Sequence, residues 1–164
     1  KGVDLLLRAL ALTPGDWHAT VVGGGNHLPA CRSLAGRLGL AERVTFTDRV
    51  AHGELENYFR RARFTLVPSR WPEPFGMVGI EAMARGRPVI GFDAGGIRDW
   101  LSDNSNGILV EQANVAQLAH AMDRLLTETH TLRRMGKRAA EDVAQRFSHE
   151  HYLDQMQRSL ENAL

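Results

Sequence analysis

Two hydrophobic patterns alternate along the chain. Short apolar runs rich in β-branched and aromatic residues predict strands at residues 19–22, 44–47, 64–67, 88–91 and 107–110. Longer stretches with apolar residues at helical spacing predict helices at about residues 3–10, 28–38, 54–61, 78–85, 115–126, 132–147 and 149–160. Strands that alternate with helices form crossover units. The sequence therefore predicts an α/β domain, with a doubly wound Rossmann-like parallel sheet and helices on both faces.

Composition places this domain among ordinary globular proteins. A chain of 164 residues with 43% apolar and 24% charged residues can form one domain, and no linker divides residues 1–164. The net charge of +1 indicates no nucleic-acid partner. The short basic clusters of the chain are typical of a solvated helix face. The single Cys31 and the lack of any apolar run of about 18 residues favour a cytoplasmic location.

The segment from residue 68 to residue 89 carries the most informative chemistry. Pro72 and Pro74 restrict the backbone on either side of Glu73, so this carboxylate is held on a stiff arm. The helix that follows starts within residues 75–77, where free backbone N–H groups and the positive end of the helix dipole favour an anion. The backbone amides of Phe75, Gly76 and Met77 are the candidates for phosphate binding, and Val78 is a further donor-binding candidate.

Two carboxylates flank this helix start. Glu73 and Glu81 are eight residues apart, and a carboxylate can accept hydrogen bonds from a vicinal diol. A nucleoside diphosphate sugar has a diol at each end and a diphosphate between them. The pattern therefore predicts Glu73 at the sugar, the helix start at the phosphates and Glu81 at the ribose. The alternative interpretation is that Glu81 is an exposed helix residue and Glu73 only a partner of the helix dipole.

A family motif has the same order and spacing. It consists of a Glu, then Phe-Gly, then a second Glu eight residues after the first, which begins Glu-Ala-Met-Ala-x-Gly-x-Pro-Val. Glu73, Phe75, Gly76 and residues 81–89 match it. The chain thus resembles the retaining glycosyltransferases of the two-domain GT-B architecture (glycosyltransferase family 4, "glycosyl transferases group 1"). The resemblance implies that Glu73 contacts the donor sugar and Glu81 the ribose.

The resemblance covers essentially the whole chain. Lys1, followed by Gly2, is similar to a family segment whose Lys binds the donor diphosphate, so Lys1 and Glu73 are the catalytic candidates. Residues 44–50 are similar to the strand and loop whose backbone reads the nucleobase, although Asp48 stands where the family usually has Gly. The further donor-binding candidates are Gly23 and Gly24 in a glycine turn and Arg49 in the base loop.

The resemblance also implies a missing half. In the family this domain is the C-terminal one, its first and central strand precedes the Lys, and a helix corresponding to residues 149–164 packs toward the N-terminal domain. A saccharide, lipid or small-molecule acceptor, and any contact with a membrane surface, would belong to that other half, so the fragment alone is expected to be inactive. No cofactor or metal is expected, because Lys1 and the helix start would neutralise the leaving group. The donor base stays open among uracil, guanine and adenine.

Other functions match parts of the same sequence. Residues 23–25 followed by Asp48 fit a nicotinamide-dependent oxidoreductase, but Leu28 occupies the position of the third glycine. A non-catalytic regulatory or assembly domain of the same fold is a further alternative. A sugar-nucleotide epimerase or a glycan phosphorylase of the same architecture would need a pocket or a lysine that the sequence does not reveal.

Overall fold

A computed structural model describes residues 1–147 of the chain, in which strands and helices alternate as the sequence predicts. The helix expected at residues 149–164 lies outside the described residues. Among those residues the strands are β1 (Ala19–Val21), β2 (Val44–Phe46), β3 (Thr65–Val67), β4 (Val89–Phe92) and β5 (Gly107–Val110). The helices are α1 (Val3–Leu12), α2 (Leu28–Arg37), α3 (His52–Arg61), α4 (Met77–Ala84), α5 (Val115–Thr127), α6 (Thr129–Arg146) and the short 3₁₀ helix η1 (Gly96–Asp99).

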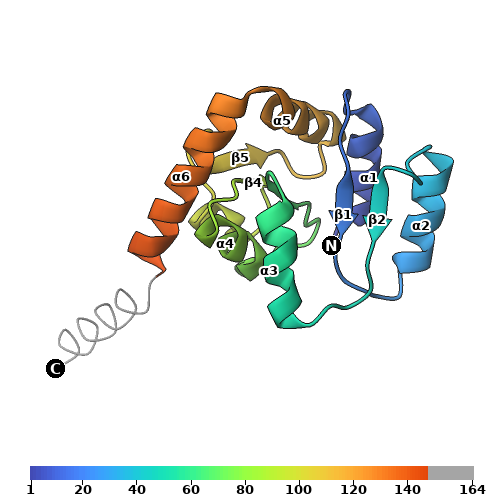
Figure 1. The fold of residues 1–164 in the computed structure, drawn as a ribbon, viewed down its shortest axis with the longest axis horizontal. Coiled ribbons are helices and arrows are strands. Elements are labelled where there is room, and N and C mark those ends of the chain that lie inside the picture. The colour runs from blue at the N-terminus through green and yellow to red at the C-terminus, as the bar shows by residue number, and fades with distance from the viewer. Residues whose placement is uncertain (148–164) are drawn as a thin grey trace.

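All strand pairs are parallel, which confirms the predicted fold class. The strands form two hydrogen-bonded ladders, β1-β2 and β3-β4-β5, where the sequence predicted one continuous sheet. Figure 1 shows the β1-β2 ladder beside α1 and α2, with β4 and β5 on the other side of the molecule near α5 and α6. Every residue of β4 is buried between two neighbouring strands, whereas β1 and β3 each have one neighbour and are only partly buried.

Helices cover both faces of the strands. Ile90 and Phe92 of β4 belong to an apolar cluster with residues of α1, α2 and α5. Val89 belongs to a second cluster, which includes Phe59 of α3 and Ala139 of α6. Because successive strand residues point to opposite faces, one strand supplies both clusters. The alternation places two core layers between three layers of secondary structure, as a doubly wound fold requires.

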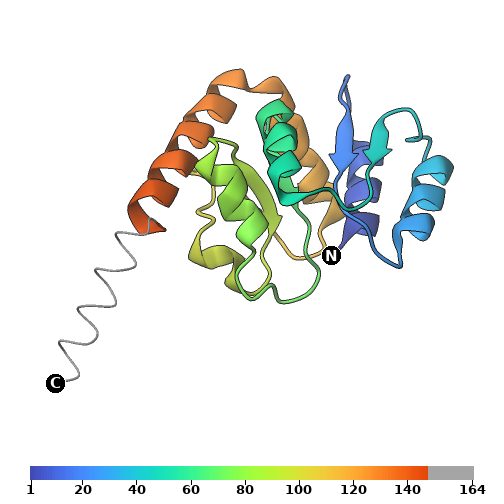
Figure 2. The same cartoon turned by 60° about the horizontal axis from the view of Figure 1, so that its bottom comes forward.

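Parallel strands bring their carboxyl ends to one edge of each ladder. The glycine turn follows β1, the loop with Arg49 follows β2, and the Pro-Glu-Pro segment follows β3. Loops at this edge are where open parallel sheets bind ligands. Figure 2 shows the N-terminus next to the loop that follows β3.

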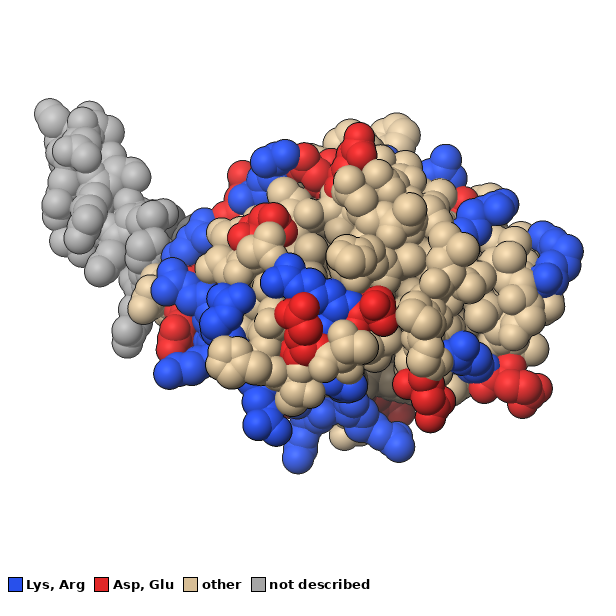
Figure 3. Space-filling view, turned by 90° about the horizontal axis from the view of Figure 1, so that it is seen from above, with Lys and Arg blue, Asp and Glu red and all other residues tan. Residues whose placement is uncertain are grey.

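Charged side chains on the described surface are largely interleaved. Figure 3 shows lysines and arginines gathered on the part of one face nearest the grey residues, with acidic side chains among them. On α6 the ion pairs Lys137–Glu141 (3.8 Å) and Arg138–Asp142 (2.9 Å) join residues one turn apart. The Lys137–Glu141 pair agrees with the predicted solvated helix face, whereas the Asp142 side chain is only 7% exposed. Within residues 1–147, no helix has the length and apolar character needed to cross a membrane.

Candidate functional site

Glu73 lies at the centre of a polar cluster formed by residues far apart in the sequence. Lys1 Nζ is 3.1 Å from Glu73 Oε2, and the Ser69 hydroxyl donates a hydrogen bond to the same oxygen at 2.9 Å. The Glu73 side chain is only 18% exposed, whereas that of Lys1 is 80% exposed. Burial by itself raises the pKa of Glu73, but the hydrogen bonds from Lys1 and Ser69 and the positive charge of Lys1 outweigh it. The pKa therefore lies below the usual glutamate value, and Glu73 is a carboxylate at neutral pH.

A glycine explains why Lys1 reaches Glu73. Gly2 has φ +77°, and a Cβ atom built on it would lie 1.8 Å from the carbonyl oxygen of Pro68. Only a residue without a side chain permits this approach of two backbone segments. The pair Lys1-Gly2 is thereby held against the loop that follows β3, and the two predicted catalytic residues are brought together.

The backbone on the other side of Glu73 is held by a second glycine pair. Glu73 forms a single parallel β-bridge with Gly95, and the Gly96 N–H donates a hydrogen bond to the Glu73 carbonyl at 2.8 Å. A Cβ atom on Gly96 would lie 2.3 Å from the carbonyl oxygen of Pro74. The stiff arm predicted from the two prolines is therefore also clamped from outside by the turn after β4.

Helix α4 begins at Met77, where the sequence predicts an anion-binding helix start. Gly76 is its N-cap residue, in a left-handed conformation (φ +81°, ψ 50°), and no side chain caps the helix. Met77 and Val78 are exposed on the first turn, the former to 57%. Because the first N–H groups of a helix have no partner within it, this uncapped end presents donors beside Glu73.

Glu81 lies one turn into α4 and is partly exposed. Its backbone carbonyl accepts a hydrogen bond from Arg85 at 2.6 Å, and Arg85 in turn pairs with Glu56 at 2.5 Å. The contacts that join Lys1, Ser69 and Glu73 do not include Glu81. Its role at a ribose therefore stays a prediction.

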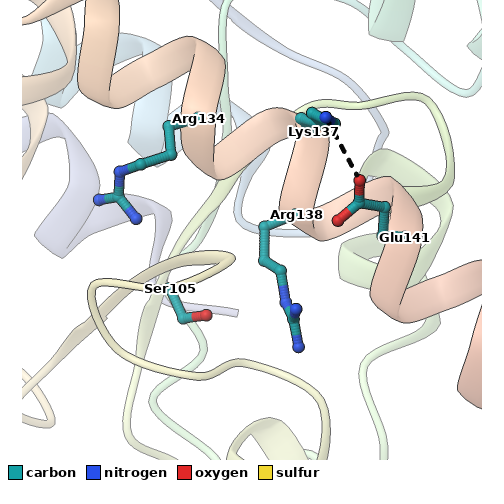
Figure 4. Close-up of a pocket in the computed structure, with 5 residues that line it drawn as sticks. All are labelled: Ser105, Arg134, Lys137, Arg138 and Glu141. Carbon is teal, nitrogen blue, oxygen red and sulfur yellow. Dashed lines mark ion pairs between the residues drawn. The ribbon is translucent and has the colours of Figure 1, made fainter.

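Two hollows of the described surface lie beside α5 and α6, away from this cluster. Figure 4 shows the one in which Arg134, Lys137 and Arg138 of α6 lie opposite Ser105. The other lies between β5 and α5. Neither hollow is lined by Glu73 or Glu81, so neither one is the predicted donor site.

The remaining donor-binding candidates form a second group at the ends of β1 and β2. The Gly23 N–H donates to the hydroxyl of Thr47 at 3.4 Å. A Cβ atom on Gly24 would lie 3.7 Å from the backbone nitrogen of Arg49. The structure thus brings the glycine turn against the loop that the family resemblance assigns to the nucleobase.

Two residues at the site were not among the sequence-based candidates. The first is Ser69, whose hydroxyl donates a hydrogen bond to the Glu73 carboxylate. Trp100 is fully buried and its indole N–H donates to the Phe75 carbonyl, at the start of α4. One sequence signal for Trp100 is Gly79, a glycine in the first turn of α4, which indicates that another group approaches closely.

The described residues also bear on metal binding. Within residues 1–147, no three His, Cys, Asp or Glu side chains are grouped as ligands for a metal ion. The expectation that donor binding needs no metal stays a prediction.

Comparison with known proteins places this chain in a family. Residues 1–142 match the glycosyl transferases group 1 family. The chain is 38% identical, over its whole length, to D-inositol 3-phosphate glycosyltransferase from Nocardia farcinica, of which it covers 38%. The Anabaena protein Alr3699/HepE, solved in complex with UDP and glucose, superposes with a TM-score of 0.90 at 28% identity. That match covers 99% of this chain and 45% of the Anabaena protein.

A third relative gives the same result. Sucrose-phosphate synthase from Thermosynechococcus elongatus superposes with a TM-score of 0.86 at 33% identity, over 100% of this chain and 43% of that one. The chain belongs to the glycosyl transferases group 1 family, and the resemblance to GT-B glycosyltransferases is confirmed. It spans less than half the length of each of these three relatives.

Proposed function

We propose that the protein transfers a sugar from a nucleoside diphosphate sugar to an acceptor, with retention at the anomeric carbon, and that this chain supplies the donor site. The observation that carries the proposal is the ion-paired carboxylate Glu73 beside the uncapped start of α4. Family membership supports sugar transfer as the reaction. The acceptor would bind to a part of the protein outside this chain, so the chain by itself is expected to turn over nothing.

The diphosphate would lie at the start of α4. The backbone N–H groups of Gly76, Met77 and Val78 are donors at the positive end of a helix, which is a favourable place for an anion. Lys1 has three N–H donors on an exposed ammonium group, so it can hold Glu73 and a phosphate at the same time. Together these groups would stabilise the negative charge that develops on the leaving diphosphate.

The two carboxylates would orient the ends of the donor. Glu73, ionised and held by Ser69 and Lys1, would accept hydrogen bonds from hydroxyls of the sugar. Glu81, one turn further along α4, would accept those of the ribose. Gly23, Gly24 and Arg49 would line the base end of the donor.

Uridine diphosphate sugars are the first donors to test. The Anabaena relative is 28% identical to this chain and was solved in complex with UDP-glucose. We therefore expect UDP to bind the full-length protein and to raise its unfolding temperature, because a ligand that binds only the folded state stabilises it. Product analysis by NMR should then find the same anomeric configuration in donor and product.

Calorimetry on a pair of variants tests the site. Glu81→Ala should weaken UDP binding to the full-length protein at least tenfold, about 1.4 kcal/mol, because the ribose loses its acceptor. Glu141→Ala removes a carboxylate on α6, away from the site, and should leave affinity unchanged. Equal affinities for the wild type and both variants would exclude the ribose role of Glu81. Absence of binding by any nucleoside diphosphate would exclude the donor site itself.

A further inference from the structure

Trp100 joins the segment after β4 to the start of α4. It directly follows η1, its side chain is completely buried, and its indole N–H donates a hydrogen bond to the carbonyl of Phe75, 25 residues earlier. That carbonyl belongs to the residue immediately before the N-cap of α4. A buried indole needs an acceptor, and here the acceptor is the backbone at the proposed phosphate site.

The indole ring lies directly against the first turn of α4. A Cβ atom on Gly79 would be 2.1 Å from Cη2 of Trp100 and 2.7 Å from both Cζ2 and Cζ3. A Cβ atom on Gly76 would be 3.3 Å from Cζ2. Glycine inside a helix costs roughly 0.5–1 kcal/mol relative to alanine, so the close approach of the ring accounts for an otherwise unfavourable residue.

Peptide geometry links this hydrogen bond to phosphate binding. The Phe75 carbonyl and the Gly76 N–H belong to the same peptide unit, and in a planar trans peptide the two groups point in opposite directions. No peptide bond in the described residues is cis. When the carbonyl points at the buried indole, the N–H must point away from it. Among residues 1–147 this N–H donates to no acceptor, so it is available to an anion.

We propose that Trp100 is a positioning residue for donor binding: its indole orients the Phe75–Gly76 peptide so that the Gly76 N–H faces the donor phosphates, and Gly79 is the matched partner that makes room for the ring. The inference rests on the proposed function, because it needs a phosphate at the start of α4. It adds a residue from a different segment, which touches neither the sugar nor the nucleotide.

Two substitutions separate orientation from packing. Trp100→Phe keeps an aromatic ring but removes the N–H donor, so UDP affinity of the full-length protein should fall roughly threefold to tenfold. Gly79→Ala should lower the unfolding temperature, because its methyl group meets the indole. A phenylalanine ring is shorter than an indole, so Gly79→Ala should be better tolerated in the Trp100→Phe background.

The double variant gives the deciding result. It should unfold at a higher temperature than Trp100→Phe alone, because the added methyl group fills space left by the indole. Its UDP affinity should stay as low as that of Trp100→Phe, because the N–H donor is still missing. If affinity instead rises with stability across the variants, Trp100 acts only by packing, and the proposal is overturned.

Failure of the inference can be told apart from failure of the proposed function. If the wild type binds UDP, Glu81→Ala weakens binding and Trp100→Phe binds as the wild type does, only the role of Trp100 is wrong. If the wild type binds no nucleoside diphosphate, the donor site is wrong and the role of Trp100 is wrong with it.

Discussion

Replacing Gly95 with alanine should disturb the arm that carries Glu73. Gly95 has φ +61° and ψ −132°, a conformation that residues with a side chain rarely adopt. A Cβ atom there would lie 2.5 Å from the carbonyl oxygen and 2.7 Å from the nitrogen of Glu73. Both neighbours are backbone atoms, so they cannot turn away as a flexible side chain could.

The size of the effect follows from these two contributions. The unusual backbone conformation costs about 1–3 kcal/mol and overpacking about another 1–3 kcal/mol, which gives a loss of roughly 2–6 kcal/mol. For a domain of this size, each kcal/mol lowers the unfolding temperature by about 2–4 °C. Gly95→Ala should therefore unfold about 4–24 °C below the wild type. It should also transfer sugar more slowly, because the Glu73 carboxylate is displaced.

The matched control is Gly36→Ala. Gly36 lies inside α2 with an ordinary φ angle, and nothing lies within 4 Å of a Cβ atom built on it. Alanine at this position should stabilise the protein by about 0.4–1 kcal/mol. Differential scanning calorimetry of the two variants checks both values. If Gly95→Ala unfolds within a degree of the wild type, the contact between Gly95 and the Glu73 arm does not hold the arm in place.

Three further predictions concern single side chains. Ser69→Ala removes a hydrogen-bond donor from the Glu73 carboxylate, so the pKa of Glu73 should rise. The acid limb of the pH–rate profile should then move to higher pH. Ser69→Thr keeps a hydroxyl and should keep the wild-type profile. Because folding lowers the pKa of Glu73, the wild type gains stability from this carboxylate above the pKa that Glu73 has in the unfolded chain. That stability is lost as the pH falls through the pKa of Glu73 in the folded protein, and the unfolding temperature measured against pH should show the loss. Lys1→Ala should lower the transfer rate more than Lys1→Arg, because only the arginine keeps a positive charge at the diphosphate; equal rates for the two would contradict that role. Asp142 is only 5% exposed, accepts a hydrogen bond from the buried Asn106 amide and pairs with Arg138. Asp142→Ala should therefore lower the free energy of unfolding, measured by chemical denaturation, by about 1–3 kcal/mol. Glu141→Ala on the same helix should lower it by less than about 0.5 kcal/mol.

Periodicity alone predicted most elements, and its errors have local causes. The strand at residues 107–110 has the predicted bounds, because its apolar run is closed on both sides by polar residues. Helix α3 starts two residues earlier than predicted, because the Glu54 carboxylate accepts from the Ala51 N–H at 2.8 Å, and alanine at a helix start gives no sequence signal. The helix η1 is too short to show a period.

Some features of the candidate site depend on neighbouring residues, and others depend on contacts between distant segments. The stiff arm around Glu73 and the helix start at Gly76 follow from neighbouring residues, so the sequence predicted both. The contacts of Gly2 with Pro68 and of Trp100 with Phe75 join segments more than 20 residues apart. Spacing along the chain does not determine which distant segments meet, and these contacts required the structure.

The most direct test of the account is a crystal structure of the full-length protein with UDP. The diphosphate should lie within hydrogen-bond distance of the backbone N–H groups of residues 76–78, with Lys1 Nζ on a phosphate oxygen and the Glu81 carboxylate on the ribose diol. A diphosphate bound away from the start of α4, with Glu81 far from the ribose, would contradict it.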